Sequence, residues 1–268
     1  MRVAVCVIAR MENAYIREFI EHYLKLGVDK IFIYDNNHDG EEHFEDVIGD
    51  YIKQGFVEII DFRNLQQVQN AAYNDCYAKH GKEYDWVLFC DTDEFLILEK
   101  HGSIKAFLKD KTNYECVLIN WKCMTDNNLI EYEDKPLIER FTEACPKDIR
   151  VQYSFSDNMH IKCIVRGGLP CVKFYSNPHV PSNPLLCCNS EGVRCDQSPF
   201  QPIAWETAYF KHFVTKSLQE YIENKLKRGV GDRSRELFLS SYRGRYYRYN
   251  KRTKEKDEWL KERNIHWI

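Results

Sequence analysis

Long apolar runs are missing from this sequence. The longest, VAVCVIA and WVLFC, are far shorter than the run of about 20 residues that a helix needs to cross a bilayer. The first residues also lack a secretory signal, because Met1 and Arg2 lead directly into a strand-like run. These absences exclude a membrane-spanning class and lead us to expect a cytoplasmic protein.

An excess of charge of one sign is missing as well. Lys and Arg number 38 and Asp and Glu number 41, so the formal net charge is -3. Nucleic-acid-binding proteins usually carry a clear basic excess, so we expect no nucleic-acid partner. No internal repeat or long linker interrupts the 268 residues, of which 44% are hydrophobic. That length and composition are enough for one domain with a substantial core.

The paired cysteine spacing of a zinc site is missing, although there are eleven cysteines. Cys187 and Cys188 are adjacent, and neighbouring ligands in sequence rarely share one tetrahedral metal. Other thiols lie within apolar strand-like runs, where a free thiol behaves as a small hydrophobe; they are Cys6, Cys90, Cys116 and Cys123. We expect most cysteines to be reduced core residues and expect no structural zinc.

The first half of the chain alternates predicted strands and helices. Apolar runs predict strands at 2–9, 30–34, 56–60, 86–90 and 116–121. Helical spacing and caps predict helices at 15–26, 44–54, 64–80 and from 103 to 108. This alternation is typical of an α/β fold with a mostly parallel sheet flanked by helices. In such folds ligands bind beyond the carboxyl ends of the strands.

The second half has a mixed pattern. Its strand candidates are HIKCIVR, CVKFYS and AYFKHFV, and an amphipathic helix is predicted from Ser217 to Arg228 with the serine as its cap. The tail at 242–263 is basic and aromatic, and we expect it to be helical or partly disordered.

The clearest chemical motif is VLFCDTDEF, in which an apolar strand is followed by Asp91 and Asp93. Alternate residues of an extended chain point the same way, so the two carboxylates are expected to converge on one hard divalent cation. Such an ion can bridge the phosphates of a nucleotide diphosphate and neutralise the charge on it as it departs. A solvated acidic turn is the alternative. A dinucleotide-binding fold is disfavoured, because ARMEN after the first strand has no glycine.

The order and spacing of these segments resemble those of GT-A glycosyltransferases. The resemblance is closest to family 2 and to family 92-like bacterial enzymes, and it is carried by the first strand, ARMENAYIREFIEHYLKLGVDKIFIYDNNHDG and WVLFCDTDEFL, over residues 3 to 98. It implies a GT-A (Rossmann-like) fold and a metal-dependent, UDP-sugar-dependent hexosyltransferase. By this resemblance, residues 1–125 bind the nucleotide sugar, residues 126–240 bind the acceptor within the same domain, and residues 241–268 form a tail.

The resemblance also implies a set of donor and metal contacts. The side chains expected at the nucleotide and its diphosphate are those of Ala9, Arg10, Glu12, Asp35, Asp91, Thr92, Lys162 and Lys216. The expected ligands of Mn²⁺ or Mg²⁺ are Asp91, Asp93 and His212. Some of these residues have ordinary alternatives: Glu12 as a carboxylate at a helix N-terminus, His212 as a core histidine, and the lysines as surface cations.

Asp126 is the predicted catalytic base. It matches the carboxylate of a W-x-x-[FY]-x-D-N-G stretch in related bacterial enzymes, and an inverting enzyme needs a base for the acceptor hydroxyl. Asn128 stands where that stretch has Gly, which leaves the loop conformation open, and an Asx-rich turn is the alternative for Asp126. His179, in SNPHVP, is either an acceptor contact or a rigid loop residue.

The expected reaction is transfer of a hexose, with galactose the family-based choice, from a UDP-sugar to a glycan in surface polysaccharide or lipopolysaccharide assembly. Cationic and aromatic residues at 242–263 would hold the enzyme at the inner face of the plasma membrane near a lipid-linked acceptor, whereas a solvated helix is the alternative. Two other functions remain. A nucleotidyltransferase would need a Gly/Lys/Arg-rich loop at the first strand, and a non-catalytic carbohydrate-binding scaffold would have no use for two metal-binding carboxylates.

Overall fold

The computed structural model describes residues 1–149, 156–226 and 242–265. In these residues ten strands form one sheet, in the order β3-β2-β1-β4-β7-β6-β10-β5, with β8 on β6 and β9 on β8. The strands are β1 (Val3–Ala9), β2 (Lys30–Asp35), β3 (Val57–Asp61), β4 (Trp86–Phe89), β5 (Glu94–Leu98), β6 (Cys116–Cys123), β7 (Ile161–Arg166), β8 (Cys187–Asn189), β9 (Arg194–Cys195) and β10 (Ala208–His212). The helices are α1 (Ile16–Lys25), α2 (Glu45–Lys53), α3 (Gln69–His80), α4 (Ile104–Lys109), α5 (Leu137–Arg140), the 3₁₀ turn η1 (Asp157–Met159), α6 (Leu218–Glu220), the π-helical turn η2 (Tyr221–Lys225), α9 (Tyr242–Tyr249) and α10 (Lys254–Glu262).

The α/β class is confirmed, and the sheet is parallel mainly in its first half. β3, β2, β1 and β4 run parallel to one another. β7 then lies antiparallel between β4 and β6, and β5 lies antiparallel to β10 at the far edge. The second half is therefore the mixed part that the sequence predicts, and it shares one sheet with the first half.

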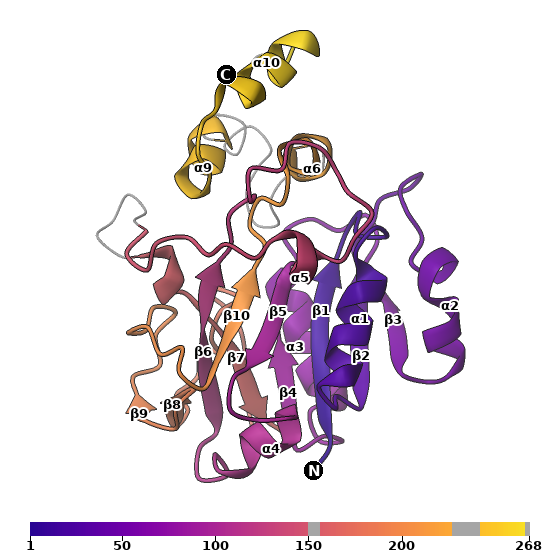
Figure 1. Ribbon diagram of the computed structural model, residues 1–268. Helices are drawn as coiled ribbons and strands as arrows, with labels where there is room; N and C mark the ends of the chain where they lie inside the picture. The colour runs from indigo at the N-terminus through magenta and orange to yellow at the C-terminus, as the bar shows by residue number, and fades with distance from the viewer. Residues whose placement is uncertain (150–155, 227–241, 266–268) are drawn as a thin grey trace.

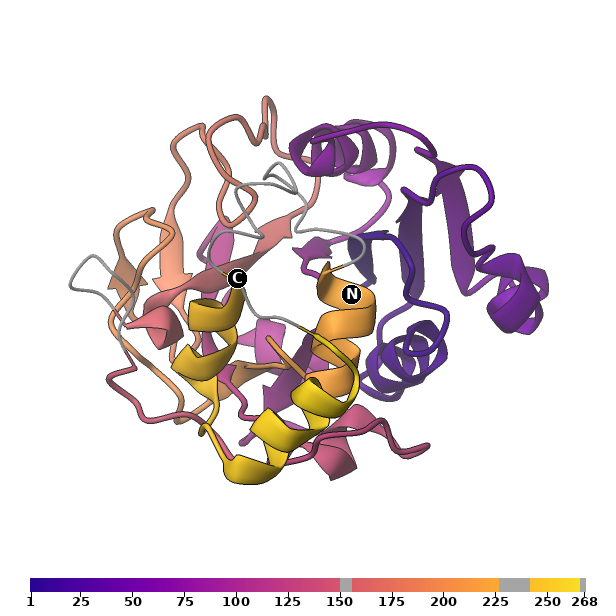
Figure 2. The same ribbon diagram turned by 90° about the horizontal axis from the view of Figure 1, so that it is seen from above.

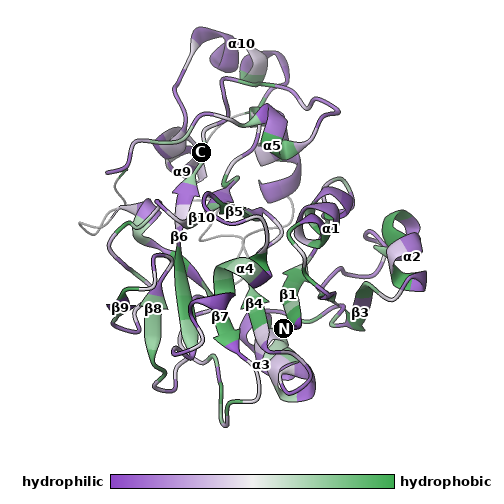
Figure 3. Cartoon of the chain, turned by 60° about the horizontal axis from the view of Figure 1, so that its bottom comes forward, coloured by the Kyte–Doolittle hydropathy of each residue, from purple (hydrophilic) through white to green (hydrophobic). Residues whose placement is uncertain are grey.

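Both faces of the sheet are buried, which explains the continuous apolar run of β1. Val3, Val5 and Val7 belong to the core under α1 and α4, whereas Ala4 and Cys6 belong to the core under α3. Figure 1 shows α1 and α3 on opposite sides of the sheet, and Figure 3 shows hydrophobic colour concentrated along the central strands. Nine of the eleven cysteines are buried and all are free, which confirms their prediction as core thiols.

Three local predictions need correction. The helix predicted from residue 64 begins only at Gln69, because Asn64 adopts a left-handed φ of 62° and bonds to Asp39. The sequence predicts no strand after the DTD motif, whereas the structure has β5 there. CVKFYS at 171–176 forms no strand: Cys171 lies in a turn, Ser176 in a bend, and the residues between them have no regular secondary structure.

The last described helices lie beyond the carboxyl edge of the sheet (Figure 1). Ser217 caps α6 through a full capping box with Glu220, as predicted, but the chain continues into the π turn η2, and residues 227 and 228 of the predicted helix lie outside the described residues. Figures 1 and 2 show α9 and α10 lying beyond the carboxyl ends of the strands, on the side of α6.

The tail is helical where it is described, and its aromatic residues pack inward. Tyr242, Tyr246 and Trp259 are buried in a cluster with Leu218 and Tyr221. The expectation that tail aromatics lie at a membrane interface is wrong for these three, because the domain itself covers them. In the described part of the chain, no helix is long and apolar enough to span a membrane.

Candidate active site at the carboxyl edge of the sheet

One edge of the sheet gathers most of the predicted site residues. β1, β2, β4, β6 and β10 end at this edge, and the antiparallel strands β5 and β7 begin there. Ala9 and Asp35 are register partners at the ends of β1 and β2. Asp91 and Asp93 follow β4, and His212 ends β10. The topology therefore brings together residues as far apart in the chain as Ala9 and His212.

Asp93 is a buried carboxylate between two basic side chains. Its carboxyl is 9% exposed, with Oδ1 3.6 Å from His212 Nε2 and Oδ2 3.1 Å from Lys225 Nζ. Burial alone raises the pKa of Asp93, but the charges of Lys225 and His212 outweigh it and hold the pKa well below its usual range. Asp93 is thus ionised at neutral pH, and its environment favours cations.

Asp91 belongs to a second ion-pair group beside the first. Lys162 is fully buried, and its Nζ lies 2.9 Å from Asp91 Oδ2 and 3.8 Å from Glu94 Oε2. Burial lowers the pKa of Lys162, but Asp91 and Glu94 more than reverse this and raise it. Gln69 Nε2 donates to Asp91 Oδ1 at 2.5 Å. Lys162, predicted as a diphosphate contact, thus lies beside the DxD motif and pairs with Asp91, and its role toward a diphosphate stays a prediction.

Asp91 and Asp93 do not converge through an extended chain as the sequence predicts. The backbone turns at this point: Glu94 N–H donates to Asp91 O at 3.1 Å, and Asp91 N–H donates to the Glu94 carboxylate at 2.8 Å. The turn sends the two aspartates to different partners. Within residues 1–149, 156–226 and 242–265, no three His, Cys, Asp or Glu side chains form a ready-made metal site.

Asp93 and His212 are nevertheless a suitable pair of donors for one cation. A carboxylate oxygen and an imidazole nitrogen each bind such an ion at about 2.1 Å, so two ligands of one ion lie about 3 to 3.5 Å apart. The 3.6 Å between Asp93 Oδ1 and His212 Nε2 is close to that separation. His212 Nδ1 is buried and lacks a hydrogen-bond partner within the described residues.

The predicted nucleotide contacts near β1 and β2 are engaged in ion pairs. Arg10 donates two hydrogen bonds to Glu41, at 2.6 and 2.9 Å. Asp35 is 2% exposed, and its Oδ2 lies 2.7 Å from Arg63. Arg10 and Asp35 therefore lie at the expected edge, but each already has an ion-pair partner in the protein.

Glu12 and Lys216 pair with each other across the edge. Lys216 Nζ lies 3.4 Å from Glu12 Oε2 and 3.2 Å from the centre of the Tyr15 ring. Lys216 has a left-handed φ of 57°, an uncommon conformation for a non-glycine residue. Thr92 is 5% exposed within the DxD turn. The structure therefore places all of these residues at one edge but leaves their roles toward a nucleotide as predictions.

Asp126 lies in a different environment from that of an exposed base. It is 1% exposed, Lys256 Nζ lies 2.5 Å from its Oδ2, and Tyr246 also donates to that oxygen. Its backbone N–H donates to Asn250 at 2.7 Å. All three partners come from α9, α10 and the segment between them, so the carboxylate anchors the C-terminal helices. This arrangement does not favour Asp126 as the base.

The backbone conformation explains how Asn128 can stand where the related stretch has Gly. Asn127 and Asn128 have φ of 50° and 61°, the left-handed region in which glycine is expected and which Asn tolerates best among other residues. Asn128 N–H donates to Asp126 Oδ1 at 2.9 Å, which is the predicted Asx turn.

The sequence matches the model of glycosyltransferase family 92 over residues 1–183, more than half of the chain. The chain belongs to glycosyltransferase family 92. The matched part contains Asp91, Asp93 and Lys162, whereas His212 and Lys225 lie beyond it. The family resemblance is thereby confirmed.

Known proteins similar to this family 92 chain are longer than it. A family 92 protein of Ricinus communis is 26% identical over 111 residues, which is 41% of this chain and 20% of that protein. One of Oryza sativa subsp. japonica is 27% identical over 108 residues, 40% of this chain and 18% of that protein. The match thus spans about a fifth of these relatives' length.

Solved structures share distant similarity. S. aureus TarS 1-349 in complex with UDP is 12% identical with a TM-score of 0.46, over 97% of this chain and 78% of that one. Glucosyl-3-phosphoglycerate synthase from Mycobacterium tuberculosis, in complex with Mn2+, UDP and glucosyl-3-phosphoglycerate, is 18% identical with a TM-score of 0.29, over 45% of this chain and 44% of that one.

Two features of the site were missed from the sequence. Lys225 lies 132 positions after Asp93, and only the tertiary fold brings them together. Trp121, near the end of β6, makes ring contacts with His212 and with His160, the residue just before β7. Their position at strand ends was a usable signal, since the same edge was already expected to bind ligand.

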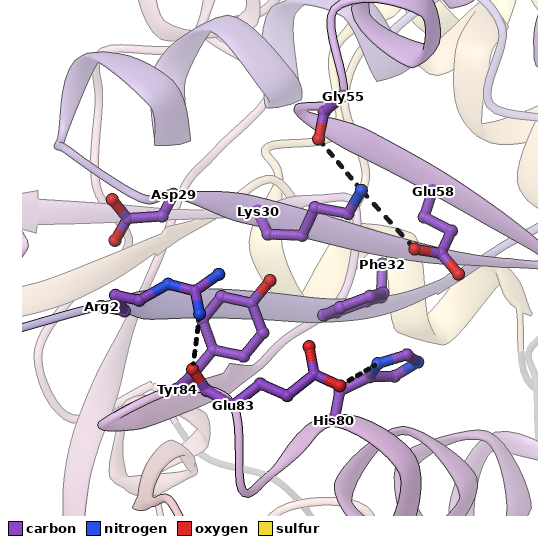
Figure 4. Close-up of a pocket in the computed structure, with 9 residues that line it drawn as sticks. All are labelled: Arg2, Asp29, Lys30, Phe32, Gly55, Glu58, His80, Glu83 and Tyr84. Atoms are coloured by element: carbon purple, nitrogen blue, oxygen red, sulfur yellow. Dashed lines mark hydrogen bonds and ion pairs between the residues drawn. The ribbon is translucent and has the colours of Figure 1, made fainter.

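A pocket lies at the opposite edge of the sheet (Figure 4). It is lined at the amino ends of the strands by Arg2, Asp29, Lys30, Phe32, Gly55, Glu58, His80, Glu83 and Tyr84. Its charged groups bind one another: Lys30 Nζ lies 3.0 Å from Gly55 O and 3.5 Å from Glu58. This pocket is separate from the carboxyl-edge site.

Proposed function

We propose that this family 92 chain is a hexosyltransferase, which transfers galactose from a UDP-sugar to a hydroxyl group of a glycan with inversion. The transfer breaks the bond between the anomeric carbon and the diphosphate oxygen, forms the new glycosidic bond to the acceptor oxygen, and releases UDP and the proton of the acceptor hydroxyl group. The protein must therefore hold a diphosphate and stabilise the charge that develops on it.

The observation that carries the proposal is the place of Asp93. It is an ionised carboxylate in a largely buried position at the carboxyl edge, with His212 on one oxygen and Lys225 on the other. Ligands of α/β sheets bind at this edge. Lys162, Lys216 and Lys225 add positive charge around it, which suits a diphosphate.

Asp93 and His212 would hold Mn²⁺ or Mg²⁺ in this proposal, with Asp91 nearby as a ligand of the ion or of its bound water. When bound, the ion would neutralise charge on the departing diphosphate as a Lewis acid. Lys225 then has to leave Asp93 Oδ2 or share it, because its ammonium occupies that oxygen at 3.1 Å.

The nucleotide would lie over the ends of β1 and β2. Ala9 would contact it through its backbone, and Asp35 would accept a hydrogen bond from the base or the ribose. Arg10 and Glu12 would frame it, and Thr92 would line the DxD turn. Asp35 is paired with Arg63, and Arg10 is paired with Glu41. Binding of the nucleotide would replace these ion pairs with contacts to the ligand.

No step is assigned to Asp126. As the base it would have to separate from Lys256 and Tyr246, which requires α9 and α10 to move away.

A role in surface polysaccharide or lipopolysaccharide assembly in the cytoplasm, at the inner face of the plasma membrane, is part of the same proposal. Contact with the membrane through residues 242–263 would depend on Arg and Lys side chains, because the buried tail aromatics are not available for it. The lipid-linked acceptor would supply the remaining attachment.

Turnover of a donor panel tests this function. Release of UDP from UDP-galactose, UDP-glucose and UDP-N-acetylglucosamine is measured with and without Mn²⁺ in the presence of methyl glycosides as acceptors, alongside pyrophosphate release from nucleoside triphosphates. We expect Mn²⁺-dependent UDP release, fastest with UDP-galactose. Pyrophosphate release instead would establish a nucleotidyltransferase, and no release from any donor would favour the non-catalytic scaffold.

A further inference from the structure

Four aromatic rings form a row that leads from the site to the surface. His212, beside Asp93, has its ring centre 4.2 Å from that of Trp121. Trp121 stacks on His160 at 4.8 Å with an interplanar angle of 18°, and His160 lies 4.4 Å from Phe200. Phe200 is 37% exposed. These four residues are called the aromatic row.

His179 joins the row from the loop between β7 and β8. Its ring centre lies 5.3 Å from that of Trp121 and 5.4 Å from that of His160. The row and His179 thus come from five separate segments, which meet at the carboxyl edge of β6.

The two outer histidines offer hydrogen-bond acceptors. Nδ1 of His160 lies 3.1 Å from the carbonyl of Asp157, and Nδ1 of His179 lies 2.9 Å from that of Ile161. A carbonyl only accepts, so each Nδ1 carries the proton and each neutral ring leaves Nε2 as an acceptor. Burial lowers the pKa of both rings, that of His179 to about 3, which keeps them neutral. Neither Nε2 has a hydrogen-bond partner within the described residues.

Two buried nitrogens of the row lack hydrogen-bond partners within the described residues. They are Nε1 of Trp121 and Nδ1 of His212, in rings that touch. Native structures rarely leave buried polar groups unpaired, and an absent ligand or water is one of the few explanations. The unpaired groups lie in the same cluster as the free Nε2 acceptors.

We infer that the aromatic row and His179 form the acceptor subsite, and that the acceptor is an uncharged sugar ring. The exposed Phe200 ring can pack against the C–H surface of a sugar, and the Nε2 atoms of His160 and His179 can accept hydrogen bonds from its hydroxyl groups. The same lone pairs repel carboxylate and phosphate oxygens. The inner end of the row lies at Asp93, so a sugar on it presents a hydroxyl group to the donor site. This inference rests on the proposed function, because it presumes a UDP-sugar donor bound beside Asp93.

Saturation-transfer NMR on the whole chain with Mn²⁺ and UDP tests the subsite. The probes are the methyl β-glycosides of galactose, glucose and N-acetylglucosamine. Methyl β-glucuronide, which carries a carboxylate, is the anionic control. We expect at least one neutral glycoside to bind more strongly than the glucuronide. His160→Phe keeps a ring but removes Nε2, and Phe200→Ala removes the exposed ring; each is expected to reduce the signal at least fivefold.

Phe56→Ala is the matched control, because Phe56 is 40% exposed on the loop that leads into β3, remote from the row. It should leave glycoside binding unchanged, and all three variants should bind UDP within twofold of the native chain. The inference is overturned if no neutral glycoside binds, if the glucuronide binds best, or if His160→Phe and Phe200→Ala bind as the native chain does. Failure of UDP binding alone would instead remove the proposed function.

Discussion

Removal of the Lys256 charge should loosen the C-terminal helices from the domain. Lys256 is fully buried, and its Nζ lies 2.5 Å from Asp126 Oδ2, whose side chain is 2% exposed. Lys256→Met has a similar length but leaves Asp126 as a buried, unpaired carboxylate. Breaking such a pair from one side costs about 3 to 5 kcal/mol.

We expect the loss of stability in Lys256→Met to lie at the lower end of that range. Tyr246 and the N–H of Asn128 still donate to Asp126 in the variant, so the carboxylate keeps two hydrogen bonds. We expect a loss of about 3 kcal/mol, and for a chain of this size about 2 to 4 °C per kcal/mol gives a fall in Tm of about 6 to 12 °C. The double variant Asp126→Asn/Lys256→Met removes both charges and should recover most of this loss.

Urea and thermal unfolding of the native chain, both single variants and the double variant measure this coupling. The anchoring role is refuted if Lys256→Met unfolds within about 2 °C of the native chain, taking the same relation between stability and Tm. If Asp126→Asn keeps the native Tm but loses transfer activity, Asp126 is the catalytic base after all.

Three further outcomes follow from the site and the fold. Lys225→Met removes a charge that lies 3.1 Å from Asp93 Oδ2, so calorimetry should show Mn²⁺ binding at least about tenfold tighter, and weaker binding would contradict the placement. Burial lowers the pKa of His22 to about 4, whereas unfolded His titrates near 6.5; the unfolded chain therefore gains a proton first, and stability falls as pH drops from 7 toward 4. His22→Gln should abolish about 2 kcal/mol of the loss between pH 7 and 5 in urea titrations, and an unchanged pH slope would count against it. Ser217→Ala removes the capping-box hydroxyl and should lower stability by about 1 kcal/mol; no change would mean that α6 does not depend on its cap.

Local patterns predict the first half of this fold well. The apolar run of β1 and the caps Ser103 and Ser217 specify their elements through neighbours within a few residues. Asn64 shows the limit: its side chain suits a helix cap, but its bonds to Asp39, 25 positions earlier, hold it in a left-handed conformation.

The sequence predicts where the site lies but not how its charged residues pair. The carboxyl-edge rule places Asp91, Asp93 and His212 together, because it depends on strand direction alone. Which charge pairs with which is a tertiary property: Lys225 reaches Asp93 across 132 positions and Lys256 reaches Asp126 across 130. No periodicity or spacing encodes those partners, so Asp126 is more readily taken for an available base than for an anchor.

The most direct test of the central claim is calorimetric binding of UDP with and without Mn²⁺, on the native chain and on Asp93→Asn. Asn keeps the size of the side chain but removes the charge that a cation needs. We predict UDP binding that requires Mn²⁺ in the native chain and a loss of at least about 100-fold in the variant, beyond the 10- to 100-fold typical of residues that only support a ligand. UDP binding that is absent, or indifferent to both the metal and the substitution, would contradict the account.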